Sequence, residues 1–327
     1  MSSVAELTRT KTSPGFFRPR RLGHVNLYVA DIDRAMNFYN RIIGIEEVYR
    51  TPLVGGGFLS NGNTHHDIGF TDANGPLGKP RGAKPGQLNH LGIELETERE
   101  LVDSYERATK AGHKFMRTAD HDIAHSIYGA DPAGIVYELY ADVVVDWRNQ
   151  RSGMVTKPKP NWTPGSTPVV ETACYHVNPE LRRVETAIFH SAKVTHAAVV
   201  VPDMAAALDH YTTIVGMQIL ARDPRDRFVL LGGDTGEHSL TFLKANDMLS
   251  AGYHHAGLKV DEPDDLAASV VRARKDGIAI EADVSHGGRR AVFLRDPEGF
   301  RVQMYSDEGR KAPAPGSIDP VLAAYIF

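Results

Sequence analysis

The chain has 327 residues, 42% hydrophobic and 24% charged, a composition typical of globular proteins and a length that favours two domains. Its formal net charge of −4 argues against nucleic acid as a partner, and no run approaches the roughly 18 apolar residues of a membrane helix. The start of the chain lacks an apolar signal segment, and the single Cys174 can form no intrachain disulfide, so we expect a cytoplasmic protein that binds small molecules.

The predicted elements of the first half follow one another as two similar units. From Gly23, "GHVNLYVADIDRAMNFYNRIIGI" alternates apolar residues like a strand and continues as an amphipathic helix that ends at a glycine. The stretch "NHLGIELETERELVDSYERATKAGH" repeats this order, and further strand-like pieces follow each helix. We therefore predict two β-α-β-β-β units over 22–72 and 87–142, after an N-terminal extension over 1–21. The loop that joins them could border the mouth of a pocket, but its three cations are expected to be solvated charges: Lys79, Arg81 and Lys84.

The predicted elements of the second half repeat those of the first. Residues 146–192 are rich in Pro, Gly, Ser and Thr and are predicted to be a linker, in which "NPELRRVET" is expected to form a short helix. Two further units are predicted over 193–244 and 252–307, before a C-terminal tail over 308–327. The predicted domains are thus 22–145 and 193–307.

A constant offset relates the two halves. Shifting the chain by 172 positions superposes six residues on chemically alike ones: His24 on His196, Asp31 on Asp203, Tyr39 on Tyr211, Gly44 on Gly216, His66 on His238 and Phe70 on Phe242. After the joining loop the shift becomes 165, so that the second copy has a loop seven residues shorter. Such self-similarity indicates an internal repeat.

Three residues of the first half are candidate metal ligands. His24 and His90 occupy equivalent places in the first strands of the two units, and Glu138 lies in the last strand of the second unit. If paired units curve into one half-barrel, these positions converge. Two imidazoles and one carboxylate form the facial triad that holds a non-haem Fe(II), which also explains why a carboxylate would be tolerated on a buried face.

The sequence from His121 to Glu138 carries a family signature. It reads His121, five residues, Ile127-Tyr128, two residues, Asp131-Pro132, one residue, Gly134, three residues and Glu138. With "HHDIGF", which contains His66, this pattern resembles the type I extradiol ring-cleaving dioxygenases of the vicinal oxygen chelate superfamily, which includes glyoxalase I. The resemblance covers all four units, with Ala119 as one departure from the signature.

The resemblance implies a fold, an activity and a site. The fold would be α+β, with four βαβββ modules paired into two half-barrel domains. The activity would be ring cleavage of a catecholic substrate next to its diol, with O2, at Fe(II) or alternatively Mn(II) held by His24, His90 and Glu138. His66 would stabilise bound oxygen and shuttle a proton, and His121 and Tyr128 would hydrogen-bond the substrate. We also expect a homo-oligomer.

One departure places the expected site in the first half. In most two-domain members the C-terminal domain holds the metal, but here Gln303 and Phe293 replace the Glu and Tyr of that half. We therefore expect one metal per chain and a degenerate second copy, although an amide oxygen at Gln303 can also ligate with His196 and His255.

Several alternatives stay open. His65 and His125 could take the roles assigned to His66 and His121. A glyoxalase or epimerase with a redox-inert metal, a metal-free drug-binding protein and a hydroquinone dioxygenase would share the fold. Oxygen uptake separates the glyoxalase or epimerase from a dioxygenase, and an iron assay separates the metal-free binding protein.

Overall fold

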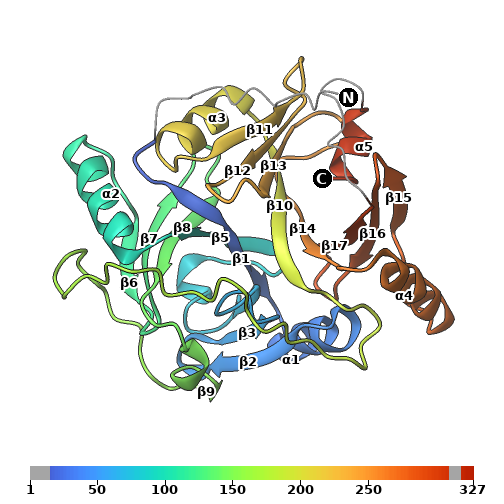
Figure 1. Cartoon of the computed structure of the whole chain (residues 1–327), viewed down its shortest axis with the longest axis horizontal. Helices are drawn as coiled ribbons and strands as arrows, with labels where there is room; N and C mark the ends of the chain where they lie inside the picture. The colour runs from blue at the N-terminus through green and yellow to red at the C-terminus, as the bar shows by residue number, and fades with distance from the viewer. Residues whose placement is uncertain (1–14, 309–317) are drawn as a thin grey trace, which may run out of the picture.

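Four β-α-β-β-β modules follow one another in the computed structural model of the chain, which describes residues 15–308 and 318–327 (Figure 1). The predicted α+β repeat is therefore confirmed. The boundaries of the two domains stay a prediction: β1 already begins inside the expected N-terminal extension, and a two-residue strand, β9, lies inside the expected linker. The first 14 residues of that extension, and 309–317 of the expected tail, lie outside the described residues.

The first two modules form one mixed sheet. The first module contains β1 (Pro19–Val29), α1 (Ile32–Phe38), β2 (Glu46–Thr51), β3 (Gly56–Ser60) and β4 (Ile68–Asp72). The second contains β5 (Gln87–Leu95), α2 (Glu98–Lys110), β6 (Arg117–Asp120), β7 (Ala124–Ala130) and β8 (Val136–Asp142). With β9 (Gly153–Met154) their strands lie in the order β6-β7-β8-β5-β1-β4-β3-β2-β9, so the first strands of the two modules meet at the centre.

The last two modules repeat this arrangement. The third contains β10 (Lys193–Val201), α3 (Met204–Thr213), β11 (Gln218–Arg222), β12 (Phe228–Gly232) and β13 (His238–Lys244). The fourth contains β14 (Gly252–Lys259), α4 (Pro263–Lys275), β15 (Ala282–His286), β16 (Arg289–Arg295) and β17 (Arg301–Asp307). Their sheet has the order β11-β12-β13-β10-β14-β17-β16-β15, and a short helix, α5 (Pro320–Ala324), lies beside it (Figure 1).

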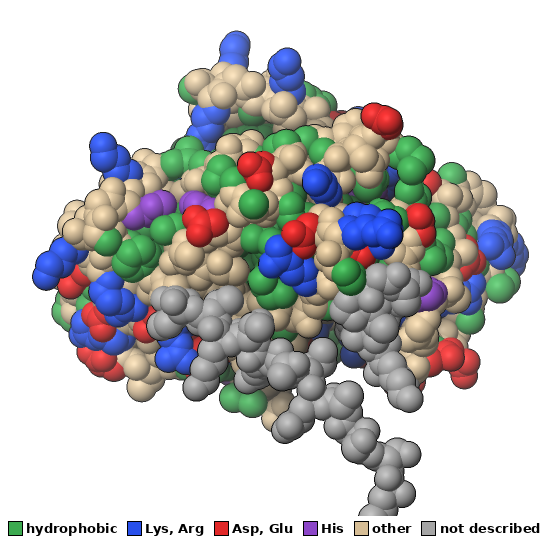
Figure 2. All heavy atoms as spheres, turned by 90° about the horizontal axis from the view of Figure 1, so that it is seen from above, with side chains coloured by type: hydrophobic (Ala, Val, Ile, Leu, Met, Phe, Trp, Pro, Cys, Tyr) green, Lys and Arg blue, Asp and Glu red, His purple; other side chains and the backbone are tan. Residues whose placement is uncertain are grey.

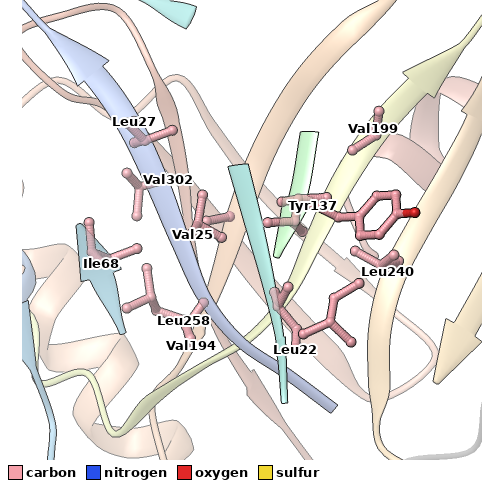
Figure 3. Close-up of a cluster of buried hydrophobic side chains, with 14 of the residues drawn as sticks. Leu22, Val25, Leu27, Ile68, Tyr137, Val194, Val199, Leu240, Leu258 and Val302 are labelled. Carbon is pink, nitrogen blue, oxygen red and sulfur yellow. The ribbon is translucent and has the colours of Figure 1, made fainter. Parts of the chain in front are cut away.

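Alternation along β1 separates a shared core from the site. Successive side chains of a strand point to opposite faces. Val25 and Leu27 pack in one buried cluster with residues of the second half such as Val194 and Leu258 (Figure 3). His24 therefore lies on the opposite face of β1, within the concavity of the first sheet.

The helices begin where the repeat places an acidic cap. The Asp31 carboxylate accepts a hydrogen bond from the backbone N–H of Arg34 at the start of α1, and the aligned Asp203 caps α3 through Ala206. Such caps satisfy backbone donors that the first helical turn leaves unpaired. The aligned residues of the repeat thus perform the same local task in both halves.

The prediction of a short helix over 178–186 is wrong. In that segment the N–H groups of Arg182 and Val184 donate to the carbonyls of Asn61 and Gly44, and Arg183 forms a bridge with Ile45. The backbone bonds with the first half instead of with itself, which removes the reason for a helix.

The surface and the helices agree with the composition. On the face seen in Figure 2, Lys and Arg side chains are interspersed with Asp and Glu. Lys79, Arg81 and Lys84 are exposed, as expected of solvated charges. Among the described residues, no helix combines the length and apolar character needed to cross a membrane.

Candidate metal centre

His24, His90 and Glu138 come together on three adjacent central strands. β5 pairs with β1 on one side and with β8 on the other, and Gly92 stands opposite both His24 and Glu138. A Cβ atom at Gly92 would lie 2.2 Å from His24 Nε2, so the glycine leaves the space that the imidazole fills. All three side chains are buried, at 7% exposure or less.

Their ligand atoms form a small triangle. His24 Nε2 lies 3.3 Å from His90 Nε2 and 3.0 Å from Glu138 Oε2, and His90 Nε2 lies 2.9 Å from the same oxygen. Two adjacent ligands at about 2.1 Å from one octahedral ion stand about 3.0 Å apart. The triangle therefore has the dimensions of one face of a divalent cation's coordination shell.

Hydrogen bonds around His90 orient a lone pair toward that triangle. The amide group of Asn89 donates to Asn26 Oδ1 and Thr71 Oγ1, at 3.1 and 2.9 Å, which leaves its oxygen as the acceptor. His90 Nδ1, 3.1 Å from that oxygen, is then the protonated nitrogen. Nε2 is left unprotonated, the form that binds a metal.

The charge states also suit a cation. Burial lowers the pKa of His24 to about 4, which keeps the imidazole neutral. Burial alone would raise the pKa of Glu138, but the neighbouring imidazoles of His24 and His90 hold it well below its usual range. Two imidazoles and one carboxylate, all buried, are a donor set for a divalent metal.

A narrow cavity of about 30 Å³ opens beside the triangle. Its walls include the ring of His66, whose centroid is 4.0 Å from that of His24. Neither ring nitrogen of His66 has a hydrogen-bond partner among the described residues, and burial lowers its pKa well below the usual range. His66 is thus a buried, neutral imidazole that lines the cavity.

His121 and Tyr128 line the same cavity and contact each other. His121 Nε2 lies 3.0 Å from the Tyr128 hydroxyl and 3.5 Å from Glu138 Oε1, and Tyr128 stands opposite Glu138 in the β7–β8 register. Burial raises the pKa of Tyr128 well above its usual value and lowers that of His121. The tyrosine is therefore a protonated donor, and the histidine is neutral.

The β7–β8 turn explains how the signature delivers Glu138. Asp131 accepts hydrogen bonds from the backbone N–H groups of Ala133 and Ile135, and Gly134 adopts a positive φ of 83° that favours glycine. This turn fixes the pairing register of the two strands.

The two competing histidines have other partners. His65 lines the cavity and, with His24 and His66, forms a second group of close donors, but its Nδ1 is 2.9 Å from Asp142. His125 pairs with Glu98 and stacks on Trp162 at 4.2 Å between ring centroids. The roles of His66 and His121 themselves stay predictions.

The equivalent place in the second half is filled by the end of the chain. Phe293 and Phe327 belong to a buried apolar cluster there, and Tyr325 packs 5.0 Å from Phe293 and 5.7 Å from His254 between ring centroids. Gln303 is fully buried in this half. Among the described residues, the groups of close His, Cys, Asp and Glu donors both include His24.

Sequence reasoning missed part of the cavity wall. Tyr49, Phe58 and Ile123 complete the apolar side, and Lys159 of the expected linker also lines it. The aromatic residues lie in predicted strands, but no motif marks them. Lys159 stands in a proline-rich stretch without periodicity, so only the tertiary structure reveals it.

Comparison with known proteins agrees with this geometry. The sequence model of the Glyoxalase/Bleomycin resistance protein/Dioxygenase superfamily matches residues 21–139 and 193–304. Catechol-2,3-dioxygenase of Bacillus subtilis (strain 168) is 26% identical over 132 residues, which are 38% of this chain and 45% of that protein. The match thus spans less than half the length of that relative.

Two solved structures share the fold. Homoprotocatechuate 2,3-dioxygenase from Arthrobacter globiformis has a TM-score of 0.65 at 13% identity, covering 96% of this chain and 92% of its own. A Mn(II)-bound glyoxalase from Novosphingobium aromaticivorans has a TM-score of 0.63 at 14% identity, covering 88% and 82%. Because the family match extends through both halves and over more than half of the residues, this chain belongs to the Glyoxalase/Bleomycin resistance protein/Dioxygenase superfamily, with extradiol dioxygenases among its relatives.

Proposed function

We propose that the protein is an extradiol dioxygenase that cleaves a catecholic ring next to its diol with O2. The observation that carries this proposal is the buried triangle of His24, His90 and Glu138, with edges of 2.9 to 3.3 Å. This donor set fits a facial triad, and Fe(II) is the metal that such a triad serves in oxygenases. Mn(II) is the alternative metal.

Fe(II) held by the trio would supply open positions for a diol and O2 and would lower the pKa of the diol hydroxyls. The protein's contribution is to hold and move protons around that position. The Tyr128 hydroxyl, kept protonated by burial, can donate a hydrogen bond to a substrate oxygen while His121 orients it. His66, neutral and without a hydrogen-bond partner among the described residues, can accept a substrate proton and return it.

A metalloenzyme that needs no O2 is the second candidate. Its support is the fold shared with the Mn(II)-bound glyoxalase, because a redox-inert metal in the same trio would act as a Lewis acid on a carbonyl substrate. The dioxygenase is favoured by the carboxylate between two histidines and by the neighbouring His121–Tyr128 pair.

Oxygen consumption tests the proposal. The protein is reconstituted with Fe(II) under nitrogen and mixed in aerated buffer with catechol, alkylcatechols, 2,3-dihydroxybiphenyl and dihydroxylated aromatic acids, and separately with a hydroquinone and a hemithioacetal. We expect O2 uptake equimolar with a yellow ring-cleaved product from at least one of them, and restoration of air-inactivated enzyme by Fe(II) and a reductant. If a hydroquinone alone is consumed, the ring-cleaving reaction belongs to that class instead. Isomerisation of a hemithioacetal without O2 would establish the glyoxalase alternative.

A further inference from the structure

A segment of the expected linker closes the open side of the first sheet. This strap, residues 151–162, pairs with β2 at one edge through β9, where Gly153 stands opposite Tyr49. At the other edge the backbone N–H of Asp120 in β6 donates to the carbonyl of Pro160 at 3.0 Å. The strap therefore joins the two sides of the half-barrel beside the cavity.

The strap carries a buried cation that lacks a hydrogen-bond acceptor. Arg151 is only 1% exposed, and none of its three guanidinium nitrogens has a hydrogen-bond partner among the residues that the structure describes. Its guanidinium carbon lies 6.0 Å from the ring centroid of Tyr49, which lines the cavity. Arginine is almost never fully buried without a partner, because desolvating an unpaired charge costs several kcal/mol.

A second cation of the strap reaches into the cavity. Lys159 lines it, with Nζ 5.0 Å from the ring centroid of Phe58, and Phe58 stacks on Tyr49 at 4.4 Å between centroids. Arg151 therefore lies near one ring, and Lys159 near the other, of a single stacked pair. The nearby carboxylates have other partners, since Glu138 contacts His24 and His90, and Asp142 contacts His65.

We propose that Arg151 and Lys159 form a carboxylate-binding subsite, so that the substrate is a catechol with an acidic side chain. The catechol part rests on the proposed function, whereas the acidic group follows from the two cations. A guanidinium matches a carboxylate with two parallel N–H donors, and an ammonium adds a point charge. The stacked rings of Tyr49 and Phe58 line the same cavity as Glu138 and Lys159 and give the substrate ring an apolar wall.

The cavity must enlarge before a substrate can enter. About 30 Å³ holds one or two water molecules and no aromatic ring. Lys159 and its part of the strap must shift when the substrate enters, which lets the lysine meet the acidic group.

Anaerobic calorimetric titration tests the subsite with matched ligands. One pair is 3,4-dihydroxyphenylacetate and 4-ethylcatechol, and the other is 3-(2,3-dihydroxyphenyl)propionate and 3-propylcatechol, so that the acidic chain projects from either ring position. For at least one pair we expect the metal-loaded protein to bind the acid at least about 10-fold more tightly. Lys159→Met should reduce that preference about 10-fold and change binding of the neutral partner by less than about 3-fold. Lys157→Met is the control, because Lys157 lies on the same strap but is exposed and pairs with Asp122.

Arg151→Met separates a binding role from a structural one. If Arg151 awaits a ligand, the variant should lose the preference for the acid while its thermal unfolding temperature in the absence of ligand stays the same or rises. A lower unfolding temperature with unchanged preference overturns the assignment of Arg151. Equal affinity of the wild type for the acid and the neutral catechol in both pairs overturns the subsite as a whole.

Because the titration contains no O2, it tests the carboxylate subsite independently of the proposed dioxygenase activity. Selective binding of an acid that is never cleaved in air would leave the subsite in place and refute the dioxygenase. Cleavage of neutral and acidic catechols with equal efficiency would support the dioxygenase and refute the subsite.

Discussion

At the scale of single residues, Glu138 provides the test of whether the first half holds a metal. Glu138→Gln reproduces the amide that Gln303 has in the second half. We expect it to remove most of the iron and all measurable ring cleavage, because it deletes the one negative charge among the three donors. Iron is measured colorimetrically after removal of loosely bound metal. Gln303→Ala is the control and should retain iron at the wild-type level; full activity of Glu138→Gln would move the site elsewhere.

His66 and Tyr128 are expected to act on chemistry and not on metal retention. Neither belongs to the triangle of donors, yet both line the cavity beside it. His66→Ala and Tyr128→Phe should keep the iron content of the wild type while kcat falls about 10²-fold or more, as when a positioned proton donor or acceptor is removed. A variant that loses iron together with activity would show that its residue supports the metal.

The charge of Lys159 should give binding a pH dependence. Burial, followed by the positive charge of Arg151, lowers the pKa of Lys159 to about 7, with Arg117 lowering it further and Glu138 opposing them. The ammonium is present below that pKa and is lost as the pH rises through it. The preference for an acidic over a neutral catechol should therefore fall between about pH 6 and 9, since a bound carboxylate moves the transition upward. In Lys159→Met the preference should be independent of pH over this range. If the variant instead shows the same pH dependence as the wild type, Lys159 is not the titrating group.

At the scale of elements, the repeat made most of the fold predictable. Strand alternation and helix caps recur at a constant offset, so the β-α-β-β-β order of all four modules follows from the sequence. The equivalence of His24 and His90 follows in the same way. The strap could not be predicted, because its course is fixed by hydrogen bonds to β2 and β6 and not by local periodicity. Both cations of the proposed subsite were missed for that reason.

Gly92 tests whether strand geometry positions His24. A Cβ atom there would lie 2.2 Å from His24 Nε2, so Gly92→Ala must displace the imidazole from the triangle. We expect the folded variant to lose most of its iron. Gly257→Ala is a matched control, because Gly257 stands against His196 in the second half in the same way, with His196 Nε2 at 2.4 Å.

Circular dichroism and iron analysis distinguish the outcomes. Native spectra for both variants, with iron lost from Gly92→Ala alone, would support His24 as a ligand. Equal iron loss from both would indicate a general effect of an added methyl group at the centre of either sheet.

At the scale of the whole molecule, the two halves share a buried core, although among the described residues the groups of close metal donors lie in the first half. Val25 and Leu27 share a buried cluster with Val194 and Leu258, so the second sheet supports the strand that carries His24 (Figure 3). From Gln303 and Phe293 the sequence predicts a degenerate second copy. It could not show that Tyr325 and Phe327 pack in the same half, because that contact depends on where the end of the chain folds back.

A titratable contact between the halves should make stability depend on pH. The Tyr39 hydroxyl of the first half donates to Asp296 Oδ2 of the second at 3.3 Å. Burial raises the pKa of Asp296 from 3.8 to about 6. Between about pH 4 and 6 the carboxyl group ionises in the unfolded chain and not in the folded one, so its contribution to the free energy of unfolding falls as the pH rises. The total loss is about 3 kcal/mol and is essentially complete by about pH 7.

Asp296→Asn removes the carboxyl group and with it this pH-dependent contribution to the free energy of unfolding. The side-chain oxygen that accepts from the backbone N–H groups of Glu298 and Phe300 in the turn is kept. We expect the stability of the variant relative to the wild type to increase by up to about 3 kcal/mol between pH 4 and 7. Urea unfolding at a series of pH values measures it, with the exposed Asp247→Asn as the control for loss of one carboxylate. A relative stability that decreases over this range would mean that ionised Asp296 stabilises the contact between the halves, contrary to the effect of its burial.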